Sequence, residues 1–322
     1  MSVLIYIDNQ DGKIKKAGFE AASYGVALAK EAGVAAVAVS LGNVEDSELT
    51  KLGNYGITKV LSCSDARFAT LDNSAIAKAL AFAASQSDAN IFVIAHNNLG
   101  KAVAPRLSVK LKAGLVSNVT GLPLSLQPFK VNKNVFTGKA IGHAVVYTEK
   151  KVLTLSYNSF GVIEQAASVA IESFDPGMND GDFGLTVEQT QKVTGKIILS
   201  EAEIVVAGGR GMKGPENWTG IEQLAEELGA GTACSRPVSD EGWRPHGEHV
   251  GQTGKIIAPN LYFAFGISGA IQHLGGVSGS KVIVAVNKDP DAPIFEAADY
   301  GIVGDAMKVL PQFIEAVKEL KA

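Results

Sequence analysis

The sequence predicts an α/β protein of two domains: an N-terminal βαβ-type parallel sheet with appended antiparallel strands, and a C-terminal doubly wound domain. Short apolar runs alternate with helical patterns from residue 3 to residue 95. An acidic stretch rich in turn formers, residues 173–188, then interrupts the chain, and a second alternation of strands and helices begins after it. Apolar strands joined by helices are typical of mostly parallel sheets that helices cover on both faces.

Each element of the first half is expected from its hydrophobic periodicity. Short continuous apolar runs indicate buried strands, and apolar residues that recur every three or four positions indicate helices. After Gly114 the pattern changes to runs that we expect to form antiparallel strands appended to the sheet. The expected order is strand 3–7, helix 17–31, strand 34–41, helix 46–55, strand 59–61, helix 73–86 and strand 91–95, then antiparallel strands 131–136, 140–147 and 152–156.

The domain boundary is expected in the segment that is richest in turn formers. Residues 173–188 are also rich in acids and bury little, which is typical of a linker or an exposed excursion. We expect domains at 1–190 and 196–322 that move about residues 186–196, because interfaces between domains are commonly modest. The second domain is expected to contain strand 204–207, helix 217–228, a loop region through 243–252, strands 262–265, 282–286 and 300–303, and a last helix over 307–320.

The composition is that of a globular protein and argues against some classes of partner. With 322 residues, of which 46% are hydrophobic and 19% charged, the chain is long enough for two ordinary cores. A formal net charge of −4, without a clustered basic face, argues against nucleic acid as a partner. Cys63 and Cys234 are too few for a disulfide framework or a tetrahedral metal site. We therefore expect a reducing compartment and a cytoplasmic protein.

No segment is expected to insert into a membrane. Residues 256–275 come closest to an apolar span, but Pro259, Gln272, His273 and several glycines interrupt them. The run Ser2–Ile7 lacks a basic leader and is expected to be a first strand rather than a signal peptide.

The most informative stretch joins a glycine-rich turn, residues 251–255, to a buried strand that opens onto small and hydrogen-bonding residues. The turn Gly-Gln-Thr-Gly-Lys is similar to a phosphate-binding loop. After the strand, Gly266, Ser268 and Gly269 let the backbone run close to a ligand and leave amide groups to donate to it. Gln272 and His273 add side-chain donors where a helix is expected to begin. This pattern predicts a cradle for a cofactor.

A second glycine-rich turn, Gly209-x-Gly211-x-x-Gly214, follows a strand and precedes a helix. In form it matches the dinucleotide fingerprint, in which glycines bring the chain close to a pyrophosphate. However, Pro215 stands where the fingerprint continues into helix, and the stretch Cys-Ser-Arg at 234–236 replaces the expected acidic residue. Taken alone, this turn is as consistent with an ordinary loop as with a nucleotide site.

The sequence contains no recognisable machinery for converting a substrate. No paired carboxylates, activated nucleophile or metal cluster can be identified, so no catalytic residue and no metal ligand is predicted. His96, His143, His246 and His249 match neither metal-ligand nor base–nucleophile spacing and are expected to be structural or surface residues. Any chemistry would be that of a cofactor.

The run Gly-Ile-Ser-Gly-Ala-Ile-Gln-His at 266–273, followed by a buried strand that ends at Asn287, closely resembles the signature of the electron-transfer flavoprotein alpha subunit. The resemblance is strong over residues 201–322. Over 1–190 it is moderate and rests on the βαβ order and on the stretches 104–107 and 138–140. The chain departs from the family at Ala306, where a larger apolar residue is usual, and at Ser156-Tyr157 before Asn158, where Arg-Pro is common.

The resemblance implies that residues 196–322 bind FAD. Arg236 would lie over the flavin ring and stabilise negative charge on the reduced ring, although an isolated loop arginine is more commonly a surface residue. Thr253 would face the N5 edge, and His273 would donate to the C2 carbonyl. Asn287 and Asp305 would hold the ADP half. The implied FAD contacts are Arg210, Ser235, Arg236, Val250, Gly251, Gln252, Thr253, Gly266, Ser268, Gly269, Ala270, Ile271, Gln272, His273, Asn287, Asp305 and Ala306.

The same resemblance implies a redox carrier rather than a substrate-converting enzyme. Such a subunit forms a heterodimer with a beta subunit, which holds AMP or a second FAD. It takes electrons from flavin dehydrogenases such as the acyl-CoA dehydrogenases of fatty acid beta-oxidation and passes them to a membrane quinone oxidoreductase. The alternatives are an electron-bifurcating flavoprotein subunit, a stand-alone flavin-dependent oxidoreductase, and a nucleotide-binding regulatory subunit without redox activity.

Overall fold

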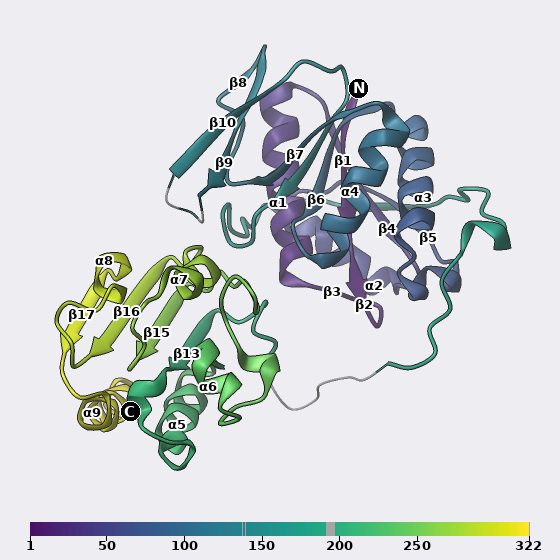
Figure 1. Cartoon of the computed structure of the whole chain (residues 1–322). Helices are drawn as coiled ribbons and strands as arrows, with labels where there is room; N and C mark the ends of the chain where they lie inside the picture. Colours follow the sequence, from purple (N-terminus) through teal and green to yellow (C-terminus); the bar gives the residue numbers. More distant parts are fainter. Residues whose placement is uncertain (137, 139, 191–196, 322) are drawn as a thin grey trace. The chain divides into compact units, whose positions relative to one another are not determined.

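The computed structural model describes residues 1–136, 138, 140–190 and 197–321, and these form two compact units, Met1–Gln191 and Lys192–Ala322 (Figure 1). We refer to them as unit 1 and unit 2. Residues 191–196 of the expected hinge and Lys139 of the stretch 138–140 lie outside the described residues. None of the described helices is long and apolar enough to cross a membrane.

Unit 1 is built on a mixed sheet whose central strands are parallel. Its strand order is β10-β9-β7-β11-β6-β1-β4-β5-β12, and β8 pairs with β9. The parallel strands are β1 (Ser2–Ile7), β4 (Ala35–Leu41), β5 (Lys59–Cys63), β6 (Ala89–Ala95), β7 (Gly114–Val119), β11 (Lys151–Leu155) and β12 (Ala170–Ser173). The antiparallel strands are β8 (Ser125–Leu126), β9 (Phe129–Val135) and β10 (Ala140–Val146).

Helices cover both faces of this sheet. On β1, Val3 and Ile5 pack into the cluster that contains Tyr24 of α1 (Lys16–Ala32), whereas Leu4 and Tyr6 point into the opposite cluster. That second cluster contains the inner sides of α3 (Asn73–Gln86) and α4 (Asn98–Leu111). The shorter elements are β2 (Asn9–Gln10), β3 (Lys13–Ile14), α2 (Asp46–Thr50), η1 (Lys51–Asn54) and η2 (Ala66–Thr70).

The structure corrects the sequence-based prediction for residues 152–156. This strand was expected to be antiparallel, but β11 runs parallel to both β6 and β7 and lies between them. Its residues Val152–Leu155 are all buried, as is usual for a strand covered on both faces. Helix α4 and strands β7 and β12 were not predicted. Pro105 lies inside α4 and made its sequence look unlike a helix.

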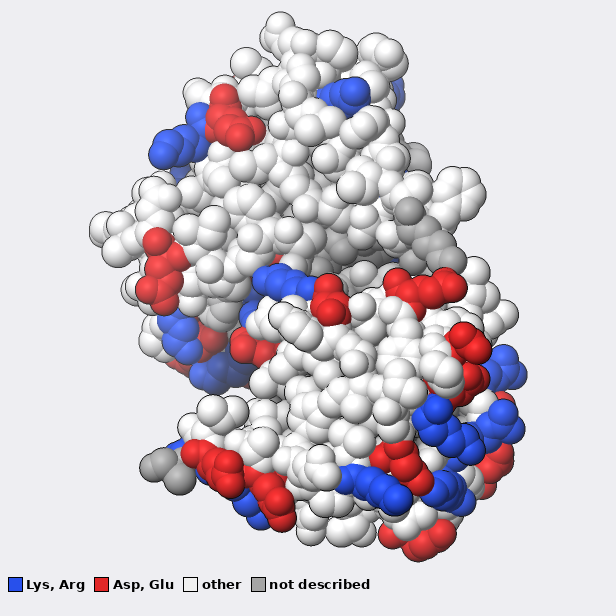
Figure 2. All heavy atoms as spheres, turned by 90° about the vertical axis from the view of Figure 1, so that its left-hand side faces the viewer, with Lys and Arg blue, Asp and Glu red and all other residues white. Residues whose placement is uncertain are grey.

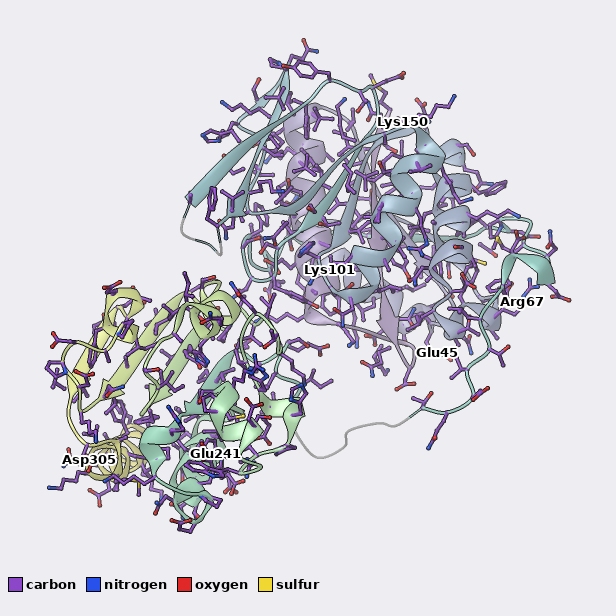
Figure 3. The ribbon with its side chains drawn as sticks, viewed as in Figure 1. Glu45, Arg67, Lys101, Lys150, Glu241 and Asp305 are labelled. Atoms are coloured by element: carbon purple, nitrogen blue, oxygen red, sulfur yellow. The ribbon has the colours of Figure 1, made fainter. Side chains whose placement is uncertain are left out.

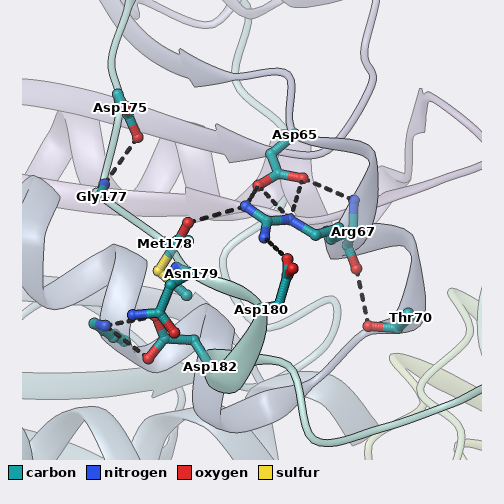
Figure 4. Close-up of polar contacts among 10 residues, drawn as sticks. Asp65, Arg67, Thr70, Asp175, Gly177, Met178, Asn179, Asp180 and Asp182 are labelled. Atoms are coloured by element: carbon teal, nitrogen blue, oxygen red, sulfur yellow. Dashed lines mark hydrogen bonds and ion pairs between the residues drawn. The ribbon is translucent and has the colours of Figure 1, made fainter.

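The turn-rich stretch was expected to be a linker or an exposed excursion. Most of its residues are exposed, and its first part is also bonded to the rest of unit 1. We call residues 174–184 the strap. Within it, η3 (Asp180–Asp182) is held by Arg67, whose Nη1 lies 2.6 Å from Asp180 Oδ1, and by Lys78, whose Nζ lies 2.6 Å from Asp182 (Figure 4). Phe174 is buried, and the Gly184 amide donates to Asp72 at 2.8 Å.

Unit 2 is a five-stranded parallel sheet with the order β14-β13-β15-β16-β17. Helices α5 and α9 cover one face, where Ile221 and Leu310 pack on Phe263 and Phe265. Helices α7 and α8 cover the other face, where Val277 and Ile294 join the cluster around Tyr262. The doubly wound prediction is confirmed. The elements are β13 (Ile204–Gly208), η4 (Arg210–Met212), η5 (Pro215–Trp218), α5 (Thr219–Leu228), β14 (Gly231–Cys234), α6 (Arg236–Asp240), η6 (His246–Glu248), β15 (Leu261–Phe265), α7 (Ile271–Val277), β16 (Val282–Asn287), α8 (Ile294–Ala297), β17 (Tyr300–Val303) and α9 (Ala306–Lys321).

Candidate cofactor site

The candidate site lies at the carboxyl edge of the sheet of unit 2. From β13 the chain passes to β14 on one side and then returns to β15 on the other side of β13. The order of the strands therefore reverses between β13 and β15. In open parallel sheets, ligands bind in the crevice beyond the carboxyl ends of the strands at such a point.

The loops that follow β13 and β15 touch through their glycine backbones. The Gly209 and Gly211 amides donate to the carbonyl oxygens of Phe265 and Gly266 at 2.9 and 3.0 Å. A Cβ on Gly209 would lie 2.3 Å from the Gly266 oxygen. Gly266 has φ +63°, a conformation that glycine adopts without strain. The helix α5 begins only at Thr219, beyond η5, so this turn departs from the dinucleotide fingerprint in which the helix follows the glycines directly.

The segment between β15 and α7 presents backbone donors. Gly269 has φ +84°, and a Cβ there would lie 2.3 Å from the Ile294 nitrogen, so only glycine fits. Among the described residues, the amides of Ser268 and Gly269 have no hydrogen-bond partner. Ser268, Ala270, Ile271 and Gln272 are exposed at this edge. Unpaired neighbouring amides suit an anionic group such as the pyrophosphate of a dinucleotide.

The glycine-rich turn at 251–255 is fixed against α7. The Gln252 amide donates to the Gln272 carbonyl oxygen at 2.8 Å, and a Cβ on Gly276 would lie 2.4 Å from the Gly251 Cα. The Val250 amide donates to the Cys234 carbonyl oxygen, at the end of β14, at 3.0 Å. The turn closes on itself through Val250 and Lys255 and leads into no helix, unlike a phosphate-binding loop. It exposes Gln252 and Thr253.

Ser235 and Arg236 follow β14 at the same edge. Ser235 is buried, and its amide donates to the Gly208 carbonyl oxygen at 3.1 Å. The Arg236 side chain is 63% exposed and its Nε lies 3.2 Å from Asp240 Oδ2, one turn later in α6. The guanidinium is therefore largely exposed at the edge and pairs with one acidic side chain.

His273 is the buried polar side chain of the site. It is 7% exposed, and its Nε2 lies 2.8 Å from the hydroxyl oxygen of Tyr262. Its Nδ1 is buried. Burial, with the neighbouring His249, lowers the pKa of His273 to about 4, and only the Val250 carbonyl opposes this shift. The ring is therefore neutral at pH 7.

The remaining predicted contacts are held by bonds within the protein. Asn287 donates from Nδ2 to the Ile267 carbonyl oxygen at 2.8 Å. Asp305 lies directly before α9 (Figure 3). It accepts from the Met307 amide at 3.0 Å and pairs with Lys213 Nζ at 2.9 Å. The hydrogen bond from Lys213 lowers the pKa of Asp305.

The structure thus brings the predicted residues to one edge of one sheet. The Arg210 side chain is exposed in η4, and Ala306 is buried in the first turn of α9. Two residues of the site were not predicted. Tyr262 had the pattern of an ordinary core residue. His249 is only 2% exposed, and its Nε2 would lie 3.4 Å from a Cβ on Gly251.

The other histidines lie outside this edge or at its rim. His96 Nδ1 lies 2.7 Å from Thr154 Oγ1, and His143 Nδ1 lies 2.7 Å from Asn132 Oδ1, both in unit 1. His246 stacks obliquely on His249 with ring centroids 5.4 Å apart.

Comparisons with known proteins match both units. The family model of the electron transfer flavoprotein domain matches residues 3–177, and that of the electron transfer flavoprotein FAD-binding domain matches residues 198–278. The chain is 35% identical to the electron transfer flavoprotein subunit alpha of Bacillus subtilis, covering 99% of this chain and 98% of the relative. It is 35% identical to the protein of the same name from Syntrophomonas wolfei, covering 98% of each chain. It is 32% identical to the acryloyl-CoA reductase electron transfer subunit beta of Anaerotignum propionicum, covering 99% of this chain and 96% of the relative.

Proposed function

This chain belongs to the electron transfer flavoprotein alpha subunit family, and on that basis we propose that it carries electrons from flavin dehydrogenases to a membrane quinone oxidoreductase. The observation that supports this most strongly is the extent of the similarity, which runs through unit 1 and unit 2 and covers 99% of the chain. The electron transfer subunit of a reductase among the relatives agrees with a carrier rather than a hydrolase or transferase.

The protein binds FAD, and unit 2 holds the family's FAD-binding domain. The residues at the carboxyl edge fit such a group. The glycines let the loops at this edge pack backbone to backbone, and the amides of Ser268 and Gly269 lack partners among the described residues. When bound, FAD supplies the one- and two-electron chemistry.

We assign the following roles to this chain's residues. The Ser268 and Gly269 amides bind the pyrophosphate, and Arg236 places a fixed positive charge at the flavin, where it favours the reduced, negatively charged forms. His273 donates a hydrogen bond to the pyrimidine part of the ring. Asn287 and Asp305 border the ADP half, where their side chains hold the neighbouring loops through the Ile267 carbonyl oxygen and the Met307 amide.

A beta subunit is the partner implied by the family, and we propose that unit 1 contacts it through the outer face of β10. In this strand Ile141 and Val145 are exposed on the same side, and the exposed Tyr147 follows the strand. Figure 2, which turns this edge of unit 1 toward the viewer, shows few charged side chains there. β10 is also the last strand of the sheet, and exposed apolar edge strands are rare unless a partner covers them.

The donors we propose are acyl-CoA dehydrogenases or similar flavin dehydrogenases, which would place the protein in fatty acid beta-oxidation. The two cysteines, Cys63 and Cys234, are both unpaired and buried, which suits the reducing environment of the cytoplasm.

The test is to express the chain with and without its beta subunit and to measure bound nucleotides. We expect a heterodimer with one FAD and one AMP. Two FAD molecules per heterodimer would instead identify the electron-bifurcating form. A stable flavin-loaded monomer with full transfer activity would contradict the heterodimeric carrier.

The partner surface is tested in the same experiment with charged variants. I141D and V145D should each weaken co-purification of the beta subunit at least tenfold, because a buried unpaired carboxylate is costly. V109D is the matched control, since Val109 is exposed on α4 of the same unit. Equal recovery of the beta subunit with all three variants would exclude the β10 face.

A further inference from the structure

A loop of unit 2, residues 235–249, leaves the sheet at the end of β14 and returns to the same place. We call it the side loop. The Val250 amide, directly after the loop, donates to the Cys234 carbonyl oxygen, directly before it, at 3.0 Å. Arg236 begins the helix α6 of the side loop, and the glycine-rich turn 251–255 follows its other end. Both ends of the side loop therefore lie at the proposed cofactor edge.

Arg244 joins the second half of the side loop to α5. This half begins at Glu241, which Figure 3 labels. The Nε and Nη2 of Arg244 donate to the two carboxylate oxygens of Glu248, in the same loop, at 2.7 and 2.9 Å. Its Nη1 donates to Glu222 Oε1 on α5 at 2.7 Å. The side chains of Arg244 and Glu248 are only 15% and 7% exposed, so these charge-assisted bonds are stronger than those of an ordinary surface ion pair.

The same guanidinium also lies against Trp218, which packs on the end of β13. The guanidinium carbon of Arg244 lies 5.6 Å from the centre of the Trp218 ring, where a cation is attracted to the ring face. Trp218 is buried, and a Cβ on Gly208 would lie 2.5 Å from its Cη2. The Gly208 carbonyl oxygen accepts from the Ser235 amide at 3.1 Å. Arg244 is thus connected to the strand end on which the side loop also begins.

Apolar packing alone does not give the side loop one fixed orientation. Val238 is buried in the cluster that contains Trp218, and the partly buried Trp243 packs on the same cluster. Such contacts are non-directional. The planar guanidinium, in contrast, donates in fixed directions to carboxylates on two separate segments.

We propose that Arg244 is a positioning residue for the flavin, which holds the side loop on α5 and thereby sets where Arg236 and the turn 251–255 stand at the cofactor edge. The proposal rests on the assignment of this edge as the FAD site. It goes further by giving a residue that pairs with two acids a role in placing the flavin's surroundings. A lysine at this position would keep the charge but lose the two-pronged bond to Glu248.

The variants are R244K and the matched pair E222Q and E227Q. Glu222 and Glu227 both lie on α5. E222Q removes the ionic tie from the helix to the side loop, whereas Glu227 pairs with Lys318 of α9 at 3.7 Å. E227Q therefore removes an acid of the same helix without altering the contact with Arg244.

The first measurement is hydrogen–deuterium exchange in the heterodimer with the beta subunit. It follows two amides that are hydrogen-bonded within the side loop, those of Trp243 and His249. Their exchange should become about tenfold faster in R244K and about twofold faster in E222Q, because the loop opens more often. E227Q should exchange as the wild type does. Wild-type exchange in R244K would overturn the proposal.

The second measurement is the reduction potential of the bound flavin, which a merely structural role of Arg244 would leave unchanged. R244K should shift the equilibrium toward oxidised flavin about twofold, because the attraction between Arg236 and the reduced ring falls with distance. In the R244K background, R236A should have a smaller effect than in the wild type, because the two residues act through one contact with the flavin.

The proposal is overturned if FAD-loaded R244K has the wild-type potential, or if R236A has the same effect in both backgrounds. Failure of the proposed function is distinct from these outcomes, since it would already be seen in the wild type as a heterodimer without bound FAD.

Discussion

Gly211 and Gly266 lie on the loops after neighbouring strands and contact each other backbone to backbone. The Gly211 amide donates to the Gly266 carbonyl oxygen at 3.0 Å, and a Cβ on Gly211 would lie 2.6 Å from the Gly266 Cα. Backbone atoms cannot move aside as the end of a flexible side chain can. This contact therefore fixes the geometry of the two loops that border the strand-order reversal.

The substitution G211A should destabilise unit 2 by about 1–3 kcal/mol, the usual cost of inserting a methyl group into a packed site. It should also weaken FAD retention, because one of the two loops must shift. Chemical unfolding followed by flavin release measures both effects. G247A is the control, since no atom lies within 4 Å of a Cβ there. Equal stability of the two variants would show that the loops adapt without cost.

Arg236→Ala should lower the flavin reduction potential by the equivalent of about 1 kcal/mol, because an exposed cation near an aromatic ring contributes this much. FAD binding should largely survive. D240N removes the acidic partner 3.2 Å from Arg236 and should not lower the potential. Spectroelectrochemical titration compares the two variants, and an unchanged potential in R236A would remove this arginine from the flavin's surroundings.

Both units should lose stability as the pH falls from 7 to 5. Burial lowers the pKa of His96 and of His273 to about 4, from the ordinary 6.5. Each histidine therefore takes up a proton near pH 6.5 in the unfolded chain but only near pH 4 in the folded unit. Between these two pH values protonation favours the unfolded chain, so the free energy of unfolding falls as the pH falls from 6.5 to 4. The loss by pH 5 should be roughly 2 kcal/mol for each histidine.

Calorimetry at several pH values tests this, and H96Q provides an internal control. The glutamine amide can still bond Thr154, which lies 2.7 Å from His96 Nδ1, but it does not titrate. In H96Q the free energy of unfolding of unit 1 should depend less on pH than in the wild type, whereas that of unit 2 should depend on pH as before. An unaltered slope for unit 1 would assign its acid sensitivity to other groups.

R67A should release the strap from the rest of unit 1. Arg67 bonds Asp65 and Asp180 and donates to the Met178 carbonyl oxygen at 3.0 Å (Figure 4). Its guanidinium carbon also lies 4.7 Å from the centre of the Phe183 ring. Proteolysis within residues 174–184 should become at least several-fold faster, since cleavage follows the population of the open form. High salt should have a similar but smaller effect on the wild type.

K59A is the matched control for this experiment. Lys59 forms an exposed ion pair with Glu172 at 2.8 Å, close to the strap but not part of it. Its removal should leave the rate of cleavage unchanged. If R67A and K59A are cut at the same rate, the ion pairs of Arg67 do not hold the strap.

The fold class and most elements could be predicted because hydrophobic periodicity is a local property. The helix expected over 73–86 has these bounds in the structure, where Asp72 caps it through the Ser74 and Ala75 amides. The strand expected over 282–286 is Val282–Asn287. The signature at 266–273 likewise lies in one continuous stretch, so the family could be identified from residues that are neighbours in the chain.

Sheet order and long-range contacts were decided by the tertiary structure. The sequence contains the apolar run of β11 but not its insertion between β6 and β7, which made it parallel rather than antiparallel. In the sequence, the acidic residues of the strap cannot be told from those of a solvated linker. In the structure, Asp180 and Asp182 bond Arg67 and Lys78, which lie more than a hundred positions earlier in the chain.

In the candidate site, too, some features follow from the sequence and others only from the tertiary structure. The sequence by itself determined which glycines and donors gather after β15, because they are consecutive. Only the tertiary structure decided that Tyr262 meets His273, since a strand residue and a helix residue can pair only after α7 folds back over the sheet. The physical reason is that periodicity records which side chains are buried, whereas the partner of a buried polar atom depends on how the elements pack.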